Sequence, residues 1–143
     1  MAATVGRPDA CSLCHADRPL TWTAGHLESW YGIPAPDGIA PVDGQPDFAA
    51  LVKWTISGDA GQRALAAWHL GQPRIGATTG DGWTTPLIAH LLDDPYDAVR
   101  GIADRSYRSV TGAAPEGWSL MMPATERAAA SRRLVEQLSL IHI

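Results

Sequence analysis

The sequence has little lysine, little cysteine and no long apolar run, and these shortages exclude several classes of protein. Lys53 is its single lysine, and the formal net charge is −4 with a pI near 5.6, so the basic stripe that usually meets nucleic acid is missing. No apolar run approaches the ~18 residues of a membrane-spanning helix. The opening residues, MAATVGRPDA, lack the basic and apolar regions of a secretory signal. We therefore expect neither a nucleic-acid partner nor a membrane span.

Signatures of common enzyme chemistry are also missing. We find no Ser-His-Asp grouping, carboxylate pair or phosphate-cradling glycine loop. Gly76, Gly80 and Gly82 follow no predicted strand and are typical of turns. We expect a chain that is not itself an enzyme, although a longer parent protein could be an oxidoreductase.

The residues that are present predict an all-α fold. A chain of 143 residues with 45% apolar content and six tryptophans is long enough for one domain, or for a small module beside a repeat array. Residues 1–19 and 33–46 are rich in proline or glycine and predict loops. Apolar spacing and capping residues predict helices at about 22–31, 47–57, 59–70, 84–94, 95–110 and 124–138.

Individual residues mark the predicted helix ends and inner faces. The capping candidates are Thr21 or Thr23, Asp59, Thr85 before Pro86, and Thr125, and the stops are Gly32, Gly58 and Gly71. The apolar positions include Leu65, Ala66, Trp68, Leu70, Val99, Ile102, Ala103, Leu134, Val135 and Leu138, with Ser106 and Tyr107 also expected to face inward.

The two central helix pairs resemble each other. With an offset of 37, Arg63 and Ala66 align with Arg100 and Ala103. Two antiparallel helices per roughly 40 residues are typical of HEAT-type solenoids, and the stretch LLDDPYDAVRGIADRSY resembles a HEAT repeat. The alternative is a plain four-helix arrangement, because about three units are usually needed for a self-sufficient array.

The only two cysteines stand three residues apart, and a histidine follows the second, in ACSLCHAD at 10–17. In such a CxxCH segment the thiols add to the vinyl groups of haem and the imidazole ligates the iron. Zinc is the main alternative, because CxxC supplies half of a tetrahedral site. There is no second cysteine pair, however, and His26, His69 and His90 would have to be recruited singly. A disulfide, a redox-active CxxC and chance spacing are the other interpretations.

The longer stretch GRPDACSLCHADRPLTWTAGHLESWYG, within residues 4–32, resembles the last haem-binding segment of bacterial multihaem c-type cytochromes of the doubled-CxxCH type, in which HEAT-like helices follow. The resemblance implies a covalent haem c, with thioether links at Cys11 and Cys14 and His15 as the proximal iron ligand. It also implies that the chain is a C-terminal fragment with further haem domains upstream.

Electron transfer is the function that this resemblance implies. The redox partner would be another protein or the upstream haem domains, with the helical repeats as a docking surface. Because covalent haem is attached outside the cytoplasm, we expect a periplasmic or other extracytoplasmic location and a signal peptide ahead of this sequence. The alternative is a HEAT-like protein-interaction module without redox chemistry, in which CxxCH is a zinc site or a remnant.

The sixth iron ligand is left open by the sequence. His26 is the nearest candidate, and Trp22, His26 and Trp30 fall four residues apart on one helix face. If the helix begins near Thr21, about six flexible residues would span roughly 20 Å, barely enough to pass round a macrocycle. The alternatives are a histidine packed between the two tryptophans, and a ligand from Met121, Met122 or the upstream portion. Trp22, Trp30 and Tyr31 would wall the haem.

The chain therefore divides into a haem-binding loop and helix at 1–33, a Pro/Gly-rich linker at 34–46, HEAT-like helical hairpins at 47–138 and a tail at 139–143. The ending LSLIHI is similar to a translated sequencing adapter. We expect this tail to be non-native and assign no function to His142; an apolar helix end is the alternative.

Overall fold

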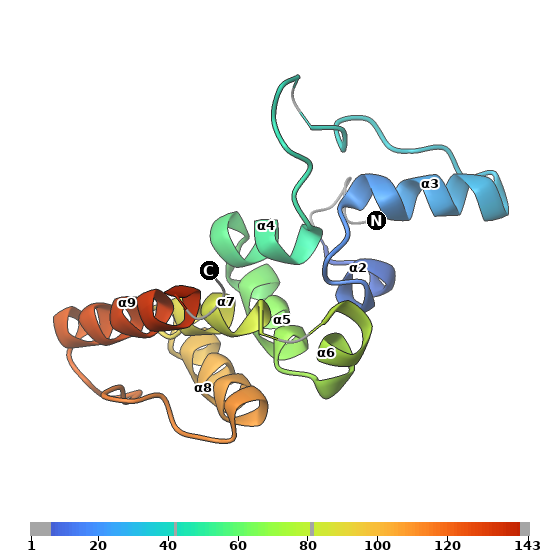
Figure 1. The fold of residues 1–143 in the computed structure, drawn as a ribbon. Helices are drawn as coiled ribbons and strands as arrows, with labels where there is room; N and C mark the ends of the chain where they lie inside the picture. Colours follow the sequence, from blue (N-terminus) through green and yellow to red (C-terminus); the bar gives the residue numbers. More distant parts are fainter. Residues whose placement is uncertain (1–6, 42, 81, 141–143) are drawn as a thin grey trace.

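The structure, a computed structural model, describes residues 7–41, 43–80 and 82–140. These residues form eight helices and no strand, which confirms the expected all-α fold. Figure 1 shows α3 at one end of the molecule and α9 at the opposite end. None of the described helices is long and apolar enough to cross a membrane. In chain order the helices are α2 (Ala10–Cys14), α3 (Leu20–Tyr31), α4 (Ala50–Ser57), α5 (Ala60–Leu70), α6 (Pro73–Thr79), α7 (Thr84–Leu91), α8 (Asp97–Thr111) and α9 (Ala124–Leu140).

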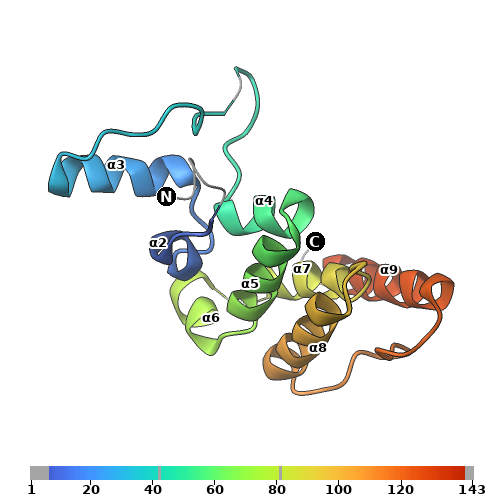
Figure 2. The ribbon, with the colours of Figure 1, turned by 180° about the vertical axis from the view of Figure 1, so that it is seen from behind.

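Two helical hairpins form the centre of the molecule. α4 packs against α5, α7 packs against α8, and α5 lies beside α8, which joins the hairpins (Figures 1 and 2). The offset of 37 predicted from the sequence holds for the second helices, because α5 begins at Ala60 and α8 at Asp97. Arg63 and Arg100 are consequently the fourth residues of their helices.

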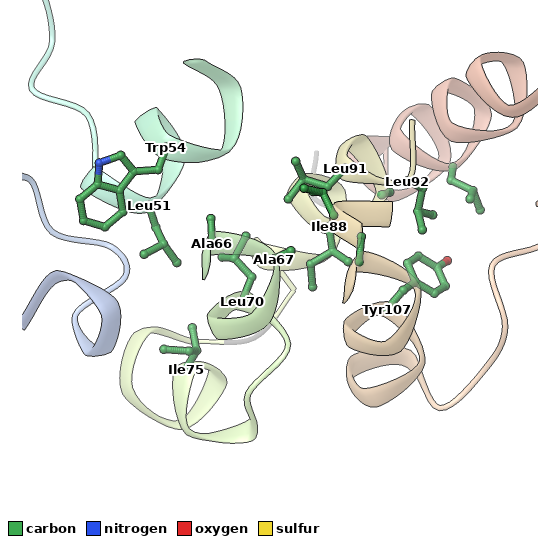
Figure 3. Packing of buried hydrophobic residues seen from close by; sticks show 14 of the residues in the cluster. Leu51, Trp54, Ala66, Ala67, Leu70, Ile75, Ile88, Leu91, Leu92 and Tyr107 are labelled. Carbon is green, nitrogen blue, oxygen red and sulfur yellow. The ribbon is translucent and has the colours of Figure 1, made fainter. Parts of the chain in front are cut away.

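One hydrophobic core runs through both hairpins (Figure 3). Leu51 of α4 and Ile88 of α7, which the offset aligns, are both fully buried. The two second helices approach closely at Gly71, where a Cβ atom would lie 2.4 Å from the side chain of Ser106. Only glycine allows this spacing between α5 and α8.

Several predicted helix ends are confirmed. The carboxylate of Asp59 accepts the N–H of Gln62 at 2.8 Å, and the side chain of Gln62 accepts the N–H of Asp59 at 2.8 Å, so α5 begins with a capping box. Gly32, Gly58 and Gly71 directly follow α3, α4 and α5. Gly32 adopts φ +65°, the left-handed conformation typical of glycine after a helix.

Two helices contradict the expected loops. The cysteine motif, expected to be extended or looped, forms the short helix α2 because Asp9 caps it. The segment with Gly76 and Gly80, expected to be a glycine-rich turn, contains α6, which has Pro73 as its first residue. Proline is favoured there because its fixed φ suits the first helical position. Gly76 is therefore a helical residue, whereas Gly80 and Gly82 have positive φ.

Several predicted helix starts or caps are wrong: α4 begins at Ala50 and not near residue 47, and Thr125 lies inside α9 instead of capping it. α3 begins at Leu20 with Pro19 as N-cap, because the hydroxyl of Thr21 donates to Asp47 instead of capping the helix. α7 begins at Thr84 with Trp83 as N-cap, so Thr85 and Pro86 are its second and third residues and not the cap and the first residue.

The predicted inner faces are mostly correct. Val99, Ala103, Ser106 and Tyr107 of α8 are buried. On α5 the predicted apolar positions Ala66 and Leu70 are buried, and Ala67 is buried as well. The predictions for Leu65 and Trp68 are wrong, because these residues are 42% and 48% exposed.

The last helix packs on the second hairpin. Leu134 is buried, and Val135 and Leu138 pack against the core. The hydroxyl of Ser131 donates to the carbonyl oxygen of Ala89 at 2.8 Å, which links α9 to α7. α9 also includes residues 139 and 140 of the predicted tail; residues 141–143, with His142, lie outside the described residues.

Candidate functional site

The cysteine motif is held by a short polar network. Asp9 accepts the backbone N–H of Ser12 at 2.9 Å and its hydroxyl at 2.9 Å. Ser12 is fully buried, and its hydroxyl lies 3.3 Å from that of Thr23 on α3. These contacts attach α2 to α3. Asp9 and Ser12 were not predicted from the sequence, and Thr23 was expected only as a helix cap, although an aspartate three positions before a serine is a typical N-cap spacing.

This anchored turn presents both thiols and the imidazole together. Cys11 and Cys14 are free, the first partly exposed and the second exposed, and residues three apart lie on one side of a helix. The N–H of His15 donates to the carbonyl oxygen of Cys11 at 2.8 Å and closes α2. The two thiols therefore belong to one short helix, and the imidazole follows directly at its C-terminal end.

Cys11 and His15 line a small apolar pocket with five residues of α3. Its volume is about 60 Å³, which is room for about two water molecules. A group as large as a porphyrin cannot be enclosed in it and would remain at the surface of the protein. The α3 residues that line the pocket are Trp22, Thr23, His26, Leu27 and Trp30.

Five aromatic rings form a continuous series along α3, which we call the aromatic ladder. The ring centroids are 4.7 Å apart for His15 and Trp22, 4.3 Å for Trp22 and His26, 4.8 Å for His26 and Trp30, and 6.4 Å for Trp30 and Tyr31. Three of the four spacings lie in the range of about 4.5–7 Å for interacting aromatic pairs, and that of Trp22 and His26 is slightly shorter. The ladder begins at the cysteine motif and ends at the surface, where Trp30 is 63% and Tyr31 71% exposed.

The ladder places His26 between two tryptophans, as in the packed-histidine alternative. The indole of Trp22 contacts the imidazoles of both His15 and His26. Only residues 16–19 separate His15 from α3, which is fewer than the expected six and gives a reach of roughly 13 Å. This shorter connection makes passage of the chain round a macrocycle harder. Ligation of iron by His26 stays a prediction.

The base of α3 is tied to the first hairpin. Thr21 donates to Asp47, and Lys53 forms an ion pair with the same carboxylate at 3.5 Å. The N–H of Ala50, at the start of α4, donates to the carbonyl oxygen of Arg18 at 3.0 Å. The guanidinium of Arg18 lies 6.0 Å from the ring centroid of Trp22, so one cation stands beside the ladder near its inner end.

The other candidate ligands lie elsewhere. His69 is hydrogen-bonded to Arg74 at 3.1 Å, and burial, together with that cation, lowers the pKa of His69. His90 is exposed on α7. Met121 is 90% exposed and Met122 packs against the core, in the segment before α9, which Figure 1 shows on the far side of the hairpins from α2. These methionines do not approach the cysteine motif.

The zinc interpretation has no complete ligand set in this arrangement. Within residues 7–41, 43–80 and 82–140, no group of three or more histidine, cysteine, aspartate or glutamate side chains is placed to hold a metal ion. A closed structural zinc site needs four ligands.

A second, larger depression lies between α4, α5, α7 and α9. Its volume is about 520 Å³, and Arg63 and Asp94 contribute to its wall. Arg63 Nε lies 2.5 Å from Asp94 Oδ2 and Nη2 lies 3.3 Å from Oδ1. This hydrogen-bonded carboxylate raises the pKa of Arg63 above its ordinary value. The ion pair joins the first hairpin to the turn of the second.

Comparison of the chain with models of known protein families, with curated proteins and with solved structures gives no match.

Proposed function

We propose that this protein is an electron carrier that binds a c-type haem covalently through Cys11 and Cys14, with His15 as the proximal iron ligand. The observation that carries the proposal is the single helical turn that presents two free thiols and an imidazole beside an aromatic helix face. When bound, the group supplies one-electron redox chemistry, while the protein supplies the axial ligand and the orientation.

The residues around the motif have defined tasks under this proposal. The two cysteines each form a thioether, and the network of Asp9, Ser12 and Thr23 keeps their turn against α3. Trp22 packs on the ring of His15 at 4.7 Å and shields one side of the imidazole from water. Such neighbours control the orientation of a ligating histidine and the local dielectric.

The sixth ligand would come from outside this chain. The connection of four residues between His15 and α3 is short, and His26 is already packed between Trp22 and Trp30. Upstream haem domains of a longer multihaem cytochrome are the proposed source. Covalent attachment would then place the protein in the periplasm or another extracytoplasmic compartment.

The hairpins are proposed to be a HEAT-like array that spaces the haem segment and offers a docking surface to a redox partner. Two features support this: the common register of α5 and α8, and the ion pair through which Arg63 of one hairpin contacts Asp94 of the next. Repeats of this kind contact mainly their neighbours along the chain.

The test is expression of the chain behind an added signal peptide in cells with the cytochrome c maturation machinery. The expected product is coloured, keeps its colour after acid-acetone extraction, and yields a peptide with Cys11 and Cys14 that carries the mass of haem. A variant with Cys11→Ala and Cys14→Ala is the matched control and should be colourless. An unmodified wild-type peptide from such cells would refute the proposal.

A protein-interaction module is the second candidate. It is favoured by Leu65 and Trp68, which are 42% and 48% exposed on the outer side of α5, because exposed aromatic and aliphatic side chains are common in interfaces. A colourless, unmodified product in the same experiment would support this candidate.

A further inference from the structure

We propose that the aromatic ladder is the electron path of this protein, running from the cysteine motif along α3 to an exit for a one-electron carrier at Trp30 and Tyr31. The inference rests on the proposed function, because the ladder begins at His15, the proposed iron ligand. It assigns a use to the outer half of α3, which haem attachment by itself leaves without one, and it places the contact for electron transfer at this tip and not on the hairpins.

The geometry of the rings supports a path rather than a scattered aromatic patch. Each ring contacts the next, with centroids 4.3–6.4 Å apart and no gap between His15 and Tyr31. Of the eight helices of the described residues, α3 packs chiefly on the short α2, and Figures 1 and 2 both show it extending away from the hairpins. The ladder is therefore not part of the main core.

The exposed end has the properties of an exit. Trp30 and Tyr31 are 63% and 71% exposed and adjoin each other at 6.4 Å. A partner that covered these two rings would contact the end of the path directly, and large aromatic side chains are favoured at the centres of interfaces. Haem at the motif and a partner at this tip would occupy opposite ends of α3.

The assignment gives His26 a role other than iron ligation. Its imidazole bridges Trp22 and Trp30 at 4.3 and 4.8 Å, and without it the two indoles would be separated by a gap. A leucine at this position would break the ladder but leave His15 and both thiols untouched. If His26 were the sixth ligand instead, the same change would alter the iron coordination.

The path can be tested without haem. A photo-oxidisable ruthenium complex is attached to Cys14 in a Cys11→Ser background, and a flash with a soluble electron acceptor removes one electron from the label. The oxidised label takes one electron from the ladder, and the resulting indole radical takes an electron from Tyr31. The phenol proton of Tyr31 passes to water, because the side chain is 71% exposed, and a neutral tyrosyl radical appears in the transient absorption spectrum.

Four variants in this labelled background decide the outcome. Tyr31→Phe and Trp30→Leu should each abolish the tyrosyl signal. The matched controls are Tyr96→Phe and Trp68→Leu, which alter a 58% exposed tyrosine and a 48% exposed tryptophan outside the ladder and should leave the signal intact. Loss of signal in the controls, or an unchanged signal in Trp30→Leu, would refute the path.

A second measurement uses the haem-loaded protein and a soluble one-electron carrier protein. Trp30→Leu and His26→Leu should slow electron transfer while the absorption spectrum stays as in the wild type. A changed axial-ligand spectrum in His26→Leu would show that His26 binds iron and would refute its place in the ladder. Failure of haem attachment refutes only the proposed function, because the ruthenium experiment does not depend on it.

Discussion

Replacing Asp94 by alanine should destabilise the protein by about 3 kcal/mol, because the ion pair with Arg63 joins the two hairpins. The side chain of Asp94 is 2% exposed and that of Arg63 is 17% exposed. Asp94 accepts two bonds from the guanidinium of Arg63 and one from the N–H of Tyr96 at 2.9 Å. Breaking a buried pair from one side costs about 3–5 kcal/mol, since a charge is left unpaired.

The lower end of that range applies here. Arg63 keeps a bond from Nη1 to the carbonyl oxygen of Gly58 at 2.5 Å, and its partial exposure allows water to reach the released guanidinium. Arg63→Met retains the apolar stem and should also cost about 3 kcal/mol. The double variant should cost less than the sum, with a coupling energy of about 2 kcal/mol.

The assay is urea and thermal unfolding of the four proteins, followed by circular dichroism. A loss of 3 kcal/mol should lower the melting temperature by roughly 6–12 °C in a chain of this length. Asp104→Ala is the control: it breaks the pair with Arg108 on α8, whose side chains are 22% and 50% exposed, and should cost at most about 0.5 kcal/mol. If Asp94→Ala costs no more than Asp104→Ala, or if the double variant is simply additive, the ion pair does not join the hairpins.

Gly71→Ala should lower the free energy of unfolding by about 2 kcal/mol, because the new Cβ would lie 2.4 Å from the side chain of Ser106. The control Gly101→Ala meets nothing within 4 Å and should stabilise α8 by about 0.5–1 kcal/mol. Equal effects of the two variants in thermal unfolding would contradict the close approach of α5 and α8. Burial and Arg74 lower the pKa of His69 below its ordinary value of 6.5. As the pH falls, His69 is therefore protonated in the unfolded chain before it is protonated in the folded one. Its contribution to stability is present above pH 6.5 and is lost as the pH falls through the folded pKa. Urea midpoints above and below pH 6.5 should show a fall on acidification that shrinks in His69→Gln; an equal fall in both proteins would oppose this.

Helix ends were predictable where a single nearby side chain decides them. Asp59 forms its capping box with Gln62, three residues on, and Gly32 ends α3 in the left-handed conformation. The offset that relates α5 to α8 was also readable, because the buried positions Ala66 and Ala103 repeat in the sequence itself.

Contacts between distant residues decided the features that the sequence analysis missed. Thr21 looked like an N-cap, but its hydroxyl bonds Asp47, 26 residues away. α6 was not predicted, because Gly76 and Gly80 indicate a turn, although Pro73 favours the first helical position. The burial of Ala67 and the exposure of Trp68 depend on where α8 packs, which apolar spacing along α5 does not specify.

The candidate site shows the same division. The motif itself and the shared face of Trp22, His26 and Trp30 follow from local spacing. The contact of Trp22 with His15 arises only after the chain turns back between α2 and α3, and the buried Ser12–Thr23 pair that fixes this turn spans 11 residues.

The described residues between α3 and α4 form no helix or strand, and they leave from the tip of α3 and come back to its base at Asp47. Since Thr21 and Lys53 hold Asp47 there, the two ends of this stretch are attached to opposite ends of α3. The entropy of such a loop grows slowly with length, by about 0.6 kcal/mol per doubling. A fluorescent domain or an affinity tag inserted into the proline-rich stretch should therefore leave the cysteine motif in place. The protein could then be immobilised through this loop without a change at either terminus.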